Sequence, residues 1–147
     1  MTLKDMLARE AIRATMARYA IAADAADYEL LAQCFTVDGV LCVVGGLVLM
    51  GRDAIVDALS SRANARGHGA QIGIFQRHVL GTCHITFQGN AAQAVTYYHV
   101  VTEIGPDHAG RYVDHFIVSE EEWLIVRRDA SVDWFDPKSR FAAALRR

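Results

Sequence analysis

The order of the periodic segments along the chain limits its fold more than any other sequence feature does. Apolar residues recur at spacings of three and four from Leu3 to about Ala23, which is the period of an amphipathic helix. Later the period changes to two, which predicts strands over Gln76–Gln88, Ala91–Ile104, Gly110–Ser119 and Trp123–Phe135. No strand–helix–strand alternation is present to build a parallel sheet. The pattern therefore predicts an α+β fold with a mostly antiparallel sheet.

Shorter elements are expected between the first helix and the long strands. Asp27 is placed to cap a second short helix. Gly45-Gly46 lies between two short apolar runs, which predicts a hairpin, because glycine permits the positive φ angles of a tight turn. Residues 51–63 then return to a helical pattern.

Turns and loops are expected between the elements of the second half of the chain. The glycine-rich stretch Asn64–Phe75 has no clear period and is expected to be a loop that gates a pocket. Gly105-Pro106-Asp107 is interpreted as the turn between two strands. Pro137 is expected to open a final helix over Lys138–Leu145.

Length and charge exclude several kinds of partner. The chain has 147 residues, which fits one domain over 1–147, and 52% of them are hydrophobic, enough for a packed interior. The formal net charge is −2 and no run of Lys or Arg exceeds two residues, so nucleic acid is not an expected partner. Charged residues interrupt every apolar stretch near the N-terminus, so neither a signal peptide nor a membrane-spanning helix is expected.

The cysteines and histidines do not form metal motifs. Cys34, Cys42 and Cys83 are odd in number and far apart, which matches neither a disulfide framework nor a zinc pattern. They are interpreted as reduced thiols of a cytoplasmic protein. The six histidines show no ligand spacing such as H-E-x-x-H. We therefore expect no metal and no other cofactor.

Three residues are candidates for proton-transfer chemistry. Tyr19 and Asp24 lie five residues apart near the end of the first helix, and His78 lies at the start of the first long strand. An imidazole titrates near neutrality and can take a proton, a carboxylate can orient its ring, and a phenol can donate to an oxyanion. The trio is sufficient for an elimination.

Each of the three residues also has a purely structural interpretation. Asp24 could stabilise the turn between two helices, and Tyr19 belongs to the apolar stripe of the first helix. His78 could be a strand histidine whose hydrogen bonds are satisfied within the fold. The residue types alone leave both interpretations open.

Several segments resemble one known family. These are RYAIAADAADYELLAQCFTVDGV, GRDAI, RHVLG, AVTYYHVV, GRYVDHFIV and the run W-x-I-x-R-R. Over nearly its whole length the chain resembles a SnoaL-like member of the nuclear-transport-factor-2-like superfamily. The resemblance implies a cone-shaped α+β barrel, in which a curved sheet wraps around the N-terminal helices. It also implies a homo-oligomer, either a dimer or a trimer.

The resemblance also implies roles for the three candidate residues. Scytalone dehydratase and bile-acid dehydratase resemble each other in pairing an Asp at the end of the first helix with a His that opens the first long strand. Asp24 and His78 fall on these positions, and the bile-acid enzyme is similar in having a Tyr where Tyr19 stands. Ketosteroid isomerases are similar near Tyr19 but use an Asp on the early hairpin, where this chain has VLCVVGG.

Further pocket residues are expected on the second and third long strands. Strand alternation puts Tyr98 and His99 on opposite faces, and a bulge near Gly81 could reverse the phase locally. His99, Tyr98 and Tyr112 are therefore all kept as expected substrate-binding residues.

The expected function is that of a cofactor-independent lyase, a dehydratase acting on a hydroxylated cyclic ketone or a similar apolar small molecule. His78 would move the proton, Asp24 would hold its ring and Tyr19 would bind an oxygen. An isomerase or polyketide-type cyclase with the same pocket is the first alternative. The resemblance also includes the β subunits of ring-hydroxylating dioxygenases, which do no chemistry themselves.

Overall fold

The helices precede the long strands, as the sequence pattern predicts. The computed structural model describes residues 1–43, 45–65 and 75–145. Its elements follow in the order α1 (Leu3–Asp24), α2 (Tyr28–Ala32), β1 (Phe35–Val43), β2 (Leu47–Met50), α3 (Arg52–Ala65), β3 (Gln76–Gln88), β4 (Ala91–Thr102), β5 (Gly105–Ser119), β6 (Glu122–Phe135) and α4 (Ala142–Leu145).

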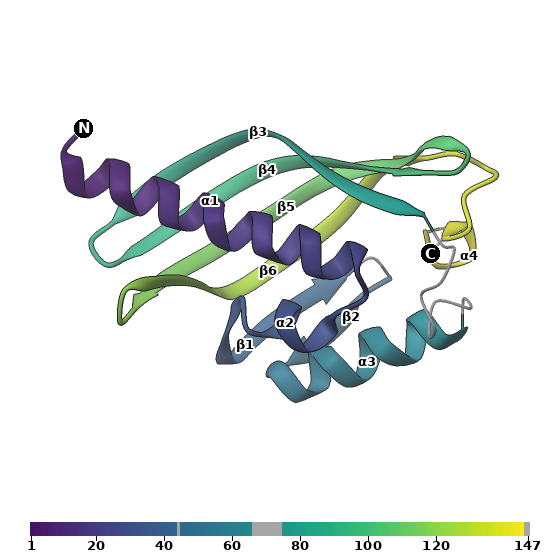
Figure 1. Cartoon of the computed structure of the whole chain (residues 1–147), viewed down its shortest axis with the longest axis horizontal. Coiled ribbons are helices and arrows are strands. Elements are labelled where there is room, and N and C mark those ends of the chain that lie inside the picture. Colours follow the sequence, from purple (N-terminus) through teal and green to yellow (C-terminus); the bar gives the residue numbers. More distant parts are fainter. Residues whose placement is uncertain (44, 66–74, 146–147) are drawn as a thin grey trace.

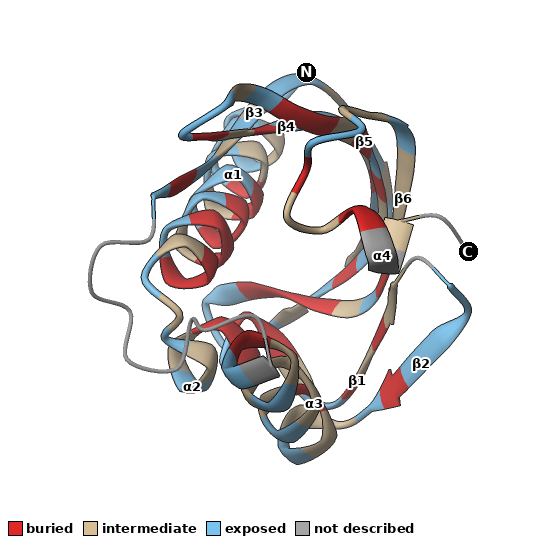
Figure 2. Ribbon diagram, turned by 90° about the vertical axis from the view of Figure 1, so that its right-hand side faces the viewer, coloured by how far each residue is buried: buried red, intermediate tan, exposed pale blue. Residues whose placement is uncertain are grey.

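The strands form one curved sheet that does not close into a barrel. Their order is β2-β1-β6-β5-β4-β3, and every neighbouring pair is antiparallel except β1 and β6. The long helix α1 lies along the concave face of β3 to β6 (Figure 1). Seen along the strands, the sheet curves around α1, and the short α4 lies inside the same curve (Figure 2). The predicted α+β fold with a mostly antiparallel sheet wrapped around N-terminal helices is confirmed.

Local sequence signals explain how α1 begins and how it is held. The Thr2 hydroxyl accepts a hydrogen bond from the Asp5 backbone N–H, and the Asp5 carboxylate accepts one from the Thr2 N–H, which is a capping box. Further along the helix, Ile12 and Met16 are buried against the sheet. The Thr15 hydroxyl donates to the Trp123 carbonyl oxygen on β6 at 2.6 Å, which fixes the helix on the sheet.

The predicted short elements of the first half are present. The Asp27 carboxylate accepts a hydrogen bond from the Leu30 backbone N–H and caps α2. Strands β1 and β2 pair as an antiparallel hairpin, with positive φ angles at Gly45 and Gly46. Most of the loop expected over Asn64–Phe75 lies outside the described residues.

Two bulges change which side chains face the concave side. On β3 the register shifts between Leu80 and Cys83, so the inward residues are even-numbered before the bulge and odd-numbered after it. On β5 the register shifts at Asp107, and β5 begins at Gly105 rather than at Gly110 as expected. The predicted turn at Gly105-Pro106-Asp107 is therefore wrong. A bulge accommodates the extra residue and lets the strand continue through this segment.

The C-terminal helix is shorter than expected, since α4 spans only Ala142–Leu145. The Asp136 carboxylate accepts from the Lys138 backbone N–H, and the Ser139 hydroxyl accepts from that of Phe141. Polar side chains that capture backbone N–H groups in this way compete with helical hydrogen bonds. They hold the chain in turns and delay the start of the helix.

Gly110 is required by the close approach of β5 and β6. A β-carbon at this position would overlap the backbone carbonyl of Ser131. We expect Gly110→Ala to lower the free energy of unfolding by about 3 kcal/mol, because the strand must move to relieve the overlap. Urea titration followed by circular dichroism measures the loss. Gly81→Ala is the matched control, since its β-carbon would lie 3.6 Å from the nearest atom, and an equal loss in both variants would contradict the prediction.

The outer face of the sheet exposes several large apolar side chains, among them Val79, Tyr97 and Trp134. The expected homo-oligomer would cover such a face, and it stays a prediction. None of the helices in the described part of the chain is long and apolar enough to cross a membrane.

Candidate active site

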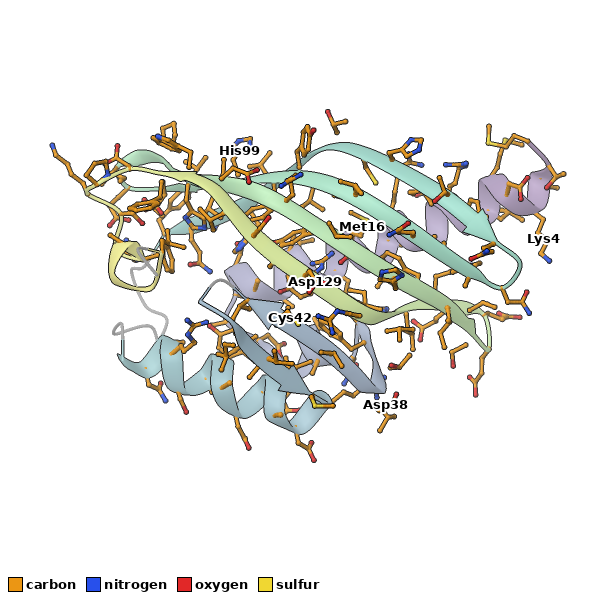
Figure 3. The ribbon with its side chains drawn as sticks, turned by 180° about the vertical axis from the view of Figure 1, so that it is seen from behind. Lys4, Met16, Asp38, Cys42, His99 and Asp129 are labelled. Atoms are coloured by element: carbon orange, nitrogen blue, oxygen red, sulfur yellow. The ribbon has the colours of Figure 1, made fainter. Side chains whose placement is uncertain are left out.

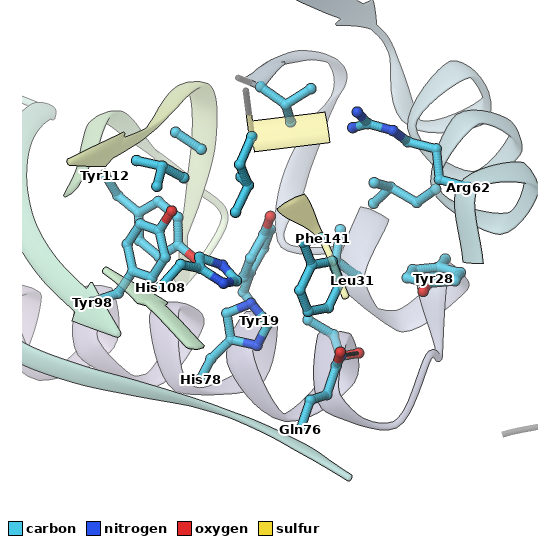
Figure 4. Close-up of a pocket in the computed structure, with 16 residues that line it drawn as sticks. Tyr19, Tyr28, Leu31, Arg62, Gln76, His78, Tyr98, His108, Tyr112 and Phe141 are labelled. Carbon is cyan, nitrogen blue, oxygen red and sulfur yellow. Dashed lines mark hydrogen bonds between the residues drawn. The ribbon is translucent and has the colours of Figure 1, made fainter. Parts of the chain in front are cut away.

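A cavity of about 180 Å³ opens between the concave face of the sheet, the end of α1 and the helices α2, α3 and α4. Most of its lining is aromatic or aliphatic. Its polar side chains come from different elements, and Figure 4 shows them turned toward a common space. They include Tyr19, Gln76, His78, Tyr98 and His108.

Asp24 and His78 form a close pair at the wall of this cavity. The Asp24 Oδ1 and the His78 Nδ1 are 2.6 Å apart, and the backbone N–H of His78 donates to both carboxylate oxygens of Asp24, at 3.0 and 3.1 Å. The side chains of Asp24 and His78 are only 13% and 18% exposed. The carboxylate therefore holds both the ring and the backbone of the histidine.

The ends of α1 and β3 are joined in a way that places this pair. The Gln76 side-chain amide donates to the Ala23 carbonyl oxygen at 3.0 Å, which satisfies a carbonyl at the C-terminal end of α1. Two residues later along β3, His78 meets Asp24. A carboxylate at the C-terminal end of a helix is electrostatically unfavourable, and the last turn of α1 contains no basic residue to offset it. The contact with His78 accounts for the presence of Asp24 at this position.

The geometry selects one tautomer of His78. Because a carboxylate only accepts hydrogen bonds, Nδ1 carries the hydrogen and the Nε2 of the neutral ring is left with a free lone pair. This atom is the one available to a ligand in the cavity. The pair has the arrangement of a general base oriented by a carboxylate.

Tyr19 lies on the cavity lining above a buried ion pair. Arg128 donates to both carboxylate oxygens of Asp114, at 2.7 and 2.8 Å, and both side chains are fully buried. The guanidinium carbon lies 4.2 Å from the centroid of the Tyr19 ring and 3.8 Å from that of Tyr112. Burial raises the pKa of Tyr19, although the Arg128 charge opposes this. The phenol therefore stays protonated and can donate a hydrogen bond.

Tyr98 and Tyr112 also line the cavity, where sequence reasoning expected them. Their rings stack with centroids 4.3 Å apart and planes 11° from parallel. The Tyr98 hydroxyl donates to the Ser131 carbonyl oxygen at 2.9 Å, and burial raises the pKa of both phenols. The two rings form a flat apolar wall for a ligand.

His99 does not line this cavity, contrary to its expected substrate-binding role. Strand β4 keeps a strict alternation, so Tyr98 points inward while the Tyr97 and His99 side chains are exposed on the opposite face. The bulge lies on β3 and leaves the phase of β4 unchanged. Figure 3 shows this outer face of the sheet with His99 on it. There His99 borders a separate depression together with Arg111 and Asp133.

A second His–Asp pair faces the cavity, and sequence reasoning missed it. The Asp107 Oδ1 and the His108 Nδ1 are 2.6 Å apart, and the two side chains are 1% and 10% exposed. His108 lines the cavity. Burial, more than any other influence, lowers the pKa of His108, against the opposing effect of Asp107. A signal was present in the adjacent Asp and His, but neighbours on a regular strand face opposite sides, and only the bulge turns both inward.

No metal site accompanies these residues in the part of the chain that the structure describes, where no three His, Cys, Asp or Glu side chains are grouped as metal ligands. The chemistry available to the cavity's own side chains is proton transfer and hydrogen bonding to oxygen, beside a largely apolar lining.

Comparisons with known proteins agree with the fold. Residues 4–129 match the family described as SnoaL-like domain. An NTF2-like protein with a cystatin-like fold from Novosphingobium aromaticivorans is 28% identical, with a TM-score of 0.77 over 99% of this chain and 92% of that chain. No curated protein matches the chain.

Two other solved structures from the same organism share the fold at lower identity. A candidate scytalone dehydratase is 20% identical, with a TM-score of 0.77, and the match covers 92% of this chain and 91% of that chain. The β subunit of a candidate aromatic-ring-hydroxylating dioxygenase is 22% identical, with a TM-score of 0.70 over 90% of this chain and 93% of that chain. These similarities confirm the SnoaL-like, NTF2-like fold that the sequence resembles.

Proposed function

The chain belongs to the SnoaL-like domain family, and from this premise we propose that it is a cofactor-independent lyase, a dehydratase acting on a hydroxylated cyclic ketone or a similar apolar small molecule. The observation that carries the proposal is the Asp24–His78 pair at the wall of a cavity lined largely by aromatic and aliphatic side chains. A scaffolding role alone has no need of an imidazole held in one tautomer with its second nitrogen open to a pocket.

The elimination needs two proton transfers and one oxygen contact. A base removes the proton from the carbon beside the carbonyl, the C–H electron pair forms the new double bond, and the hydroxyl leaves as water after receiving a proton. The Nε2 of His78 moves the proton, and Asp24 stabilises the charged ring that forms. Tyr19 donates a hydrogen bond to the carbonyl oxygen, where negative charge develops.

The shape of the cavity supports a flat or cyclic substrate. Tyr98 and Tyr112 form a stacked wall, and Leu31 and Phe141 are among the apolar residues that complete the lining. An apolar lining with a few polar groups orients a small molecule and excludes water from the reacting atoms. An isomerase or cyclase would use the same pair and pocket, but would release no water.

A noncatalytic role is the main rival from another class of protein. The similarity to a dioxygenase β subunit supports it, since the fold serves both kinds of protein. In that case the pocket would turn over nothing, and the chain would instead bind an oxygenase subunit.

A substrate panel tests the proposal. We expect the protein to convert at least one cyclic β-hydroxyketone to the enone, detected by ultraviolet absorbance and by mass spectrometry as loss of water. Tyr19→Phe should lower turnover about tenfold, since one hydrogen bond to the developing oxyanion is lost. Tyr97→Phe is the matched control, because Tyr97 is exposed on the outer face. Rearranged product without water loss would indicate an isomerase, and no conversion of any panel member would favour the noncatalytic role.

A further inference from the structure

We propose that Asp107–His108 is a second proton-transfer pair serving the same cavity, which makes His108 a further catalytic residue and Asp107 its positioning residue. The inference rests on the proposed elimination, which it deepens by assigning the two proton transfers to two different imidazoles.

Both pairs have the same internal geometry. In each, a carboxylate Oδ1 lies 2.6 Å from the histidine Nδ1, so Nε2 of each neutral ring is left with a free lone pair. His78 and His108 both line the cavity, and the ring of Tyr98 lies beside both, with centroids at 6.4 and 6.2 Å. The labelled imidazoles lie near one another on the cavity wall in Figure 4.

Asp107 is held far more firmly than a surface carboxylate. Besides His108, its side chain accepts hydrogen bonds from the Ser139 hydroxyl at 2.5 Å and from the Thr102 hydroxyl at 3.2 Å. Its backbone carbonyl accepts from the Asp136 N–H at 2.8 Å. The bulge on β5 and the turn before α4 therefore converge on one buried carboxylate. Such support fixes the orientation of the histidine that the carboxylate contacts.

The second pair removes a difficulty of the single-histidine reaction, in which one ring must both take and give a proton. With two rings, the Nε2 of His108 takes the proton from the carbon and the C–H pair becomes the double bond. For the second transfer, the Nε2 of His78 first takes a proton from solvent, and the charged ring is stabilised by Asp24. His78 then gives this proton to the departing hydroxyl, which leaves as water. His108 has gained the proton of the carbon and His78 has lost its proton to the water, and exchange with solvent restores both rings.

Burial supports this division of roles. The His108 side chain is 10% exposed and that of His78 is 18% exposed, so His78 has the better access to solvent protons. The lowered pKa of His108, caused chiefly by its burial, keeps that ring neutral and ready to accept a proton.

Imidazole nitrogen NMR of the full chain tests the proposal without requiring turnover. Long-range proton–nitrogen spectra are recorded with and without 2-naphthol, a flat aromatic alcohol whose hydroxyl can donate to Nε2. We expect the Nε2 signals of both His78 and His108 to shift, while the exposed His99 on the outer face does not. A shift confined to His78 would overturn the second pair and leave the proposed function standing. A shift of neither ring would contradict both.

Steady-state kinetics on any substrate that the wild-type chain converts provides a second test of the proposal. His108→Gln should lower turnover by a factor on the order of 10² or more with little change in KM, because Gln cannot accept and return a proton. Ser139→Ala should lower turnover less, because it removes one hydrogen bond to Asp107 but leaves both imidazoles in place. His99→Gln is the matched control. Full turnover by a folded His108→Gln chain would overturn the proposal.

Discussion

Replacing His78 with alanine is expected to lower turnover by a factor on the order of 10²–10⁴ while the fold stays intact, because the ring that moves the proton is removed from a cavity wall. The measurement is steady-state turnover of a substrate identified in the panel, with circular dichroism to verify folding. His84→Ala is the matched control, since His84 lies on the same strand and is exposed. Unchanged turnover in the His78 variant would remove this residue from the mechanism.

The same experiment extends to Asp24 and separates charge from shape. Asp24→Asn keeps the size and a hydrogen-bonding oxygen but cannot stabilise a charged imidazole, so we expect it to be damaging as well. Because Asp24 acts through His78, the variant that carries both substitutions should lose little more turnover than the single variant with the larger loss. Losses that add independently would show that the two residues do not act as a unit.

The largest expected effect on stability is at the ion pair beneath the cavity. Arg128→Met should lower the free energy of unfolding by about 3–5 kcal/mol, because it leaves the Asp114 carboxylate buried with no cation to offset its charge. Burial is the largest influence on the Arg128 pKa and acts to lower it, but Asp114 more than reverses this, so the native guanidinium is charged. The substitution also removes the cation that contacts the Tyr19 and Tyr112 rings. Denaturant unfolding measures the loss.

A double variant distinguishes an unpaired charge from lost packing. Asp114→Leu combined with Arg128→Met removes both charges, so we expect it to be more stable than Arg128→Met alone. Arg111→Met is the matched control on the same two strands, since Arg111 and Asp133 form an exposed pair at 3.5 Å worth less than about 1 kcal/mol. If Arg128→Met cost no more than this control, the ion pair would not be a major contribution to stability.

Much of the fold could be predicted from periodicity and from a few local signals. The bounds predicted for β3 are the ones that the structure shows, and α1 ends within a residue of the expected position. The Asp27 cap and the Gly45-Gly46 hairpin are also present. These features depend on contacts between residues close together in sequence. The positions that fail, the start of β5 and the start of α4, are those where side chains or a bulge compete with the local pattern.

The candidate site was predictable only in part. Tyr19, Asp24 and His78 were named from residue types and a family resemblance, and the structure brings Asp24 and His78 into contact across 54 residues of sequence. In the run W-x-I-x-R-R, the two neighbouring arginines have different environments, and Arg127 pairs with Asp129 at the exposed surface. Strand alternation turns the next residue, Arg128, into the interior.

The sequence by itself determined the order of elements, because hydrophobic periodicity and caps act over a few neighbouring residues. Only the tertiary structure decided which side chains share the cavity, because a single inserted residue in a strand reverses every face that follows it. The bulge at Asp107 places two consecutive polar residues inward, and the unbroken alternation of β4 leaves His99 outside. Neither outcome is encoded in the residue types, since each depends on how adjacent strands pair across the sheet.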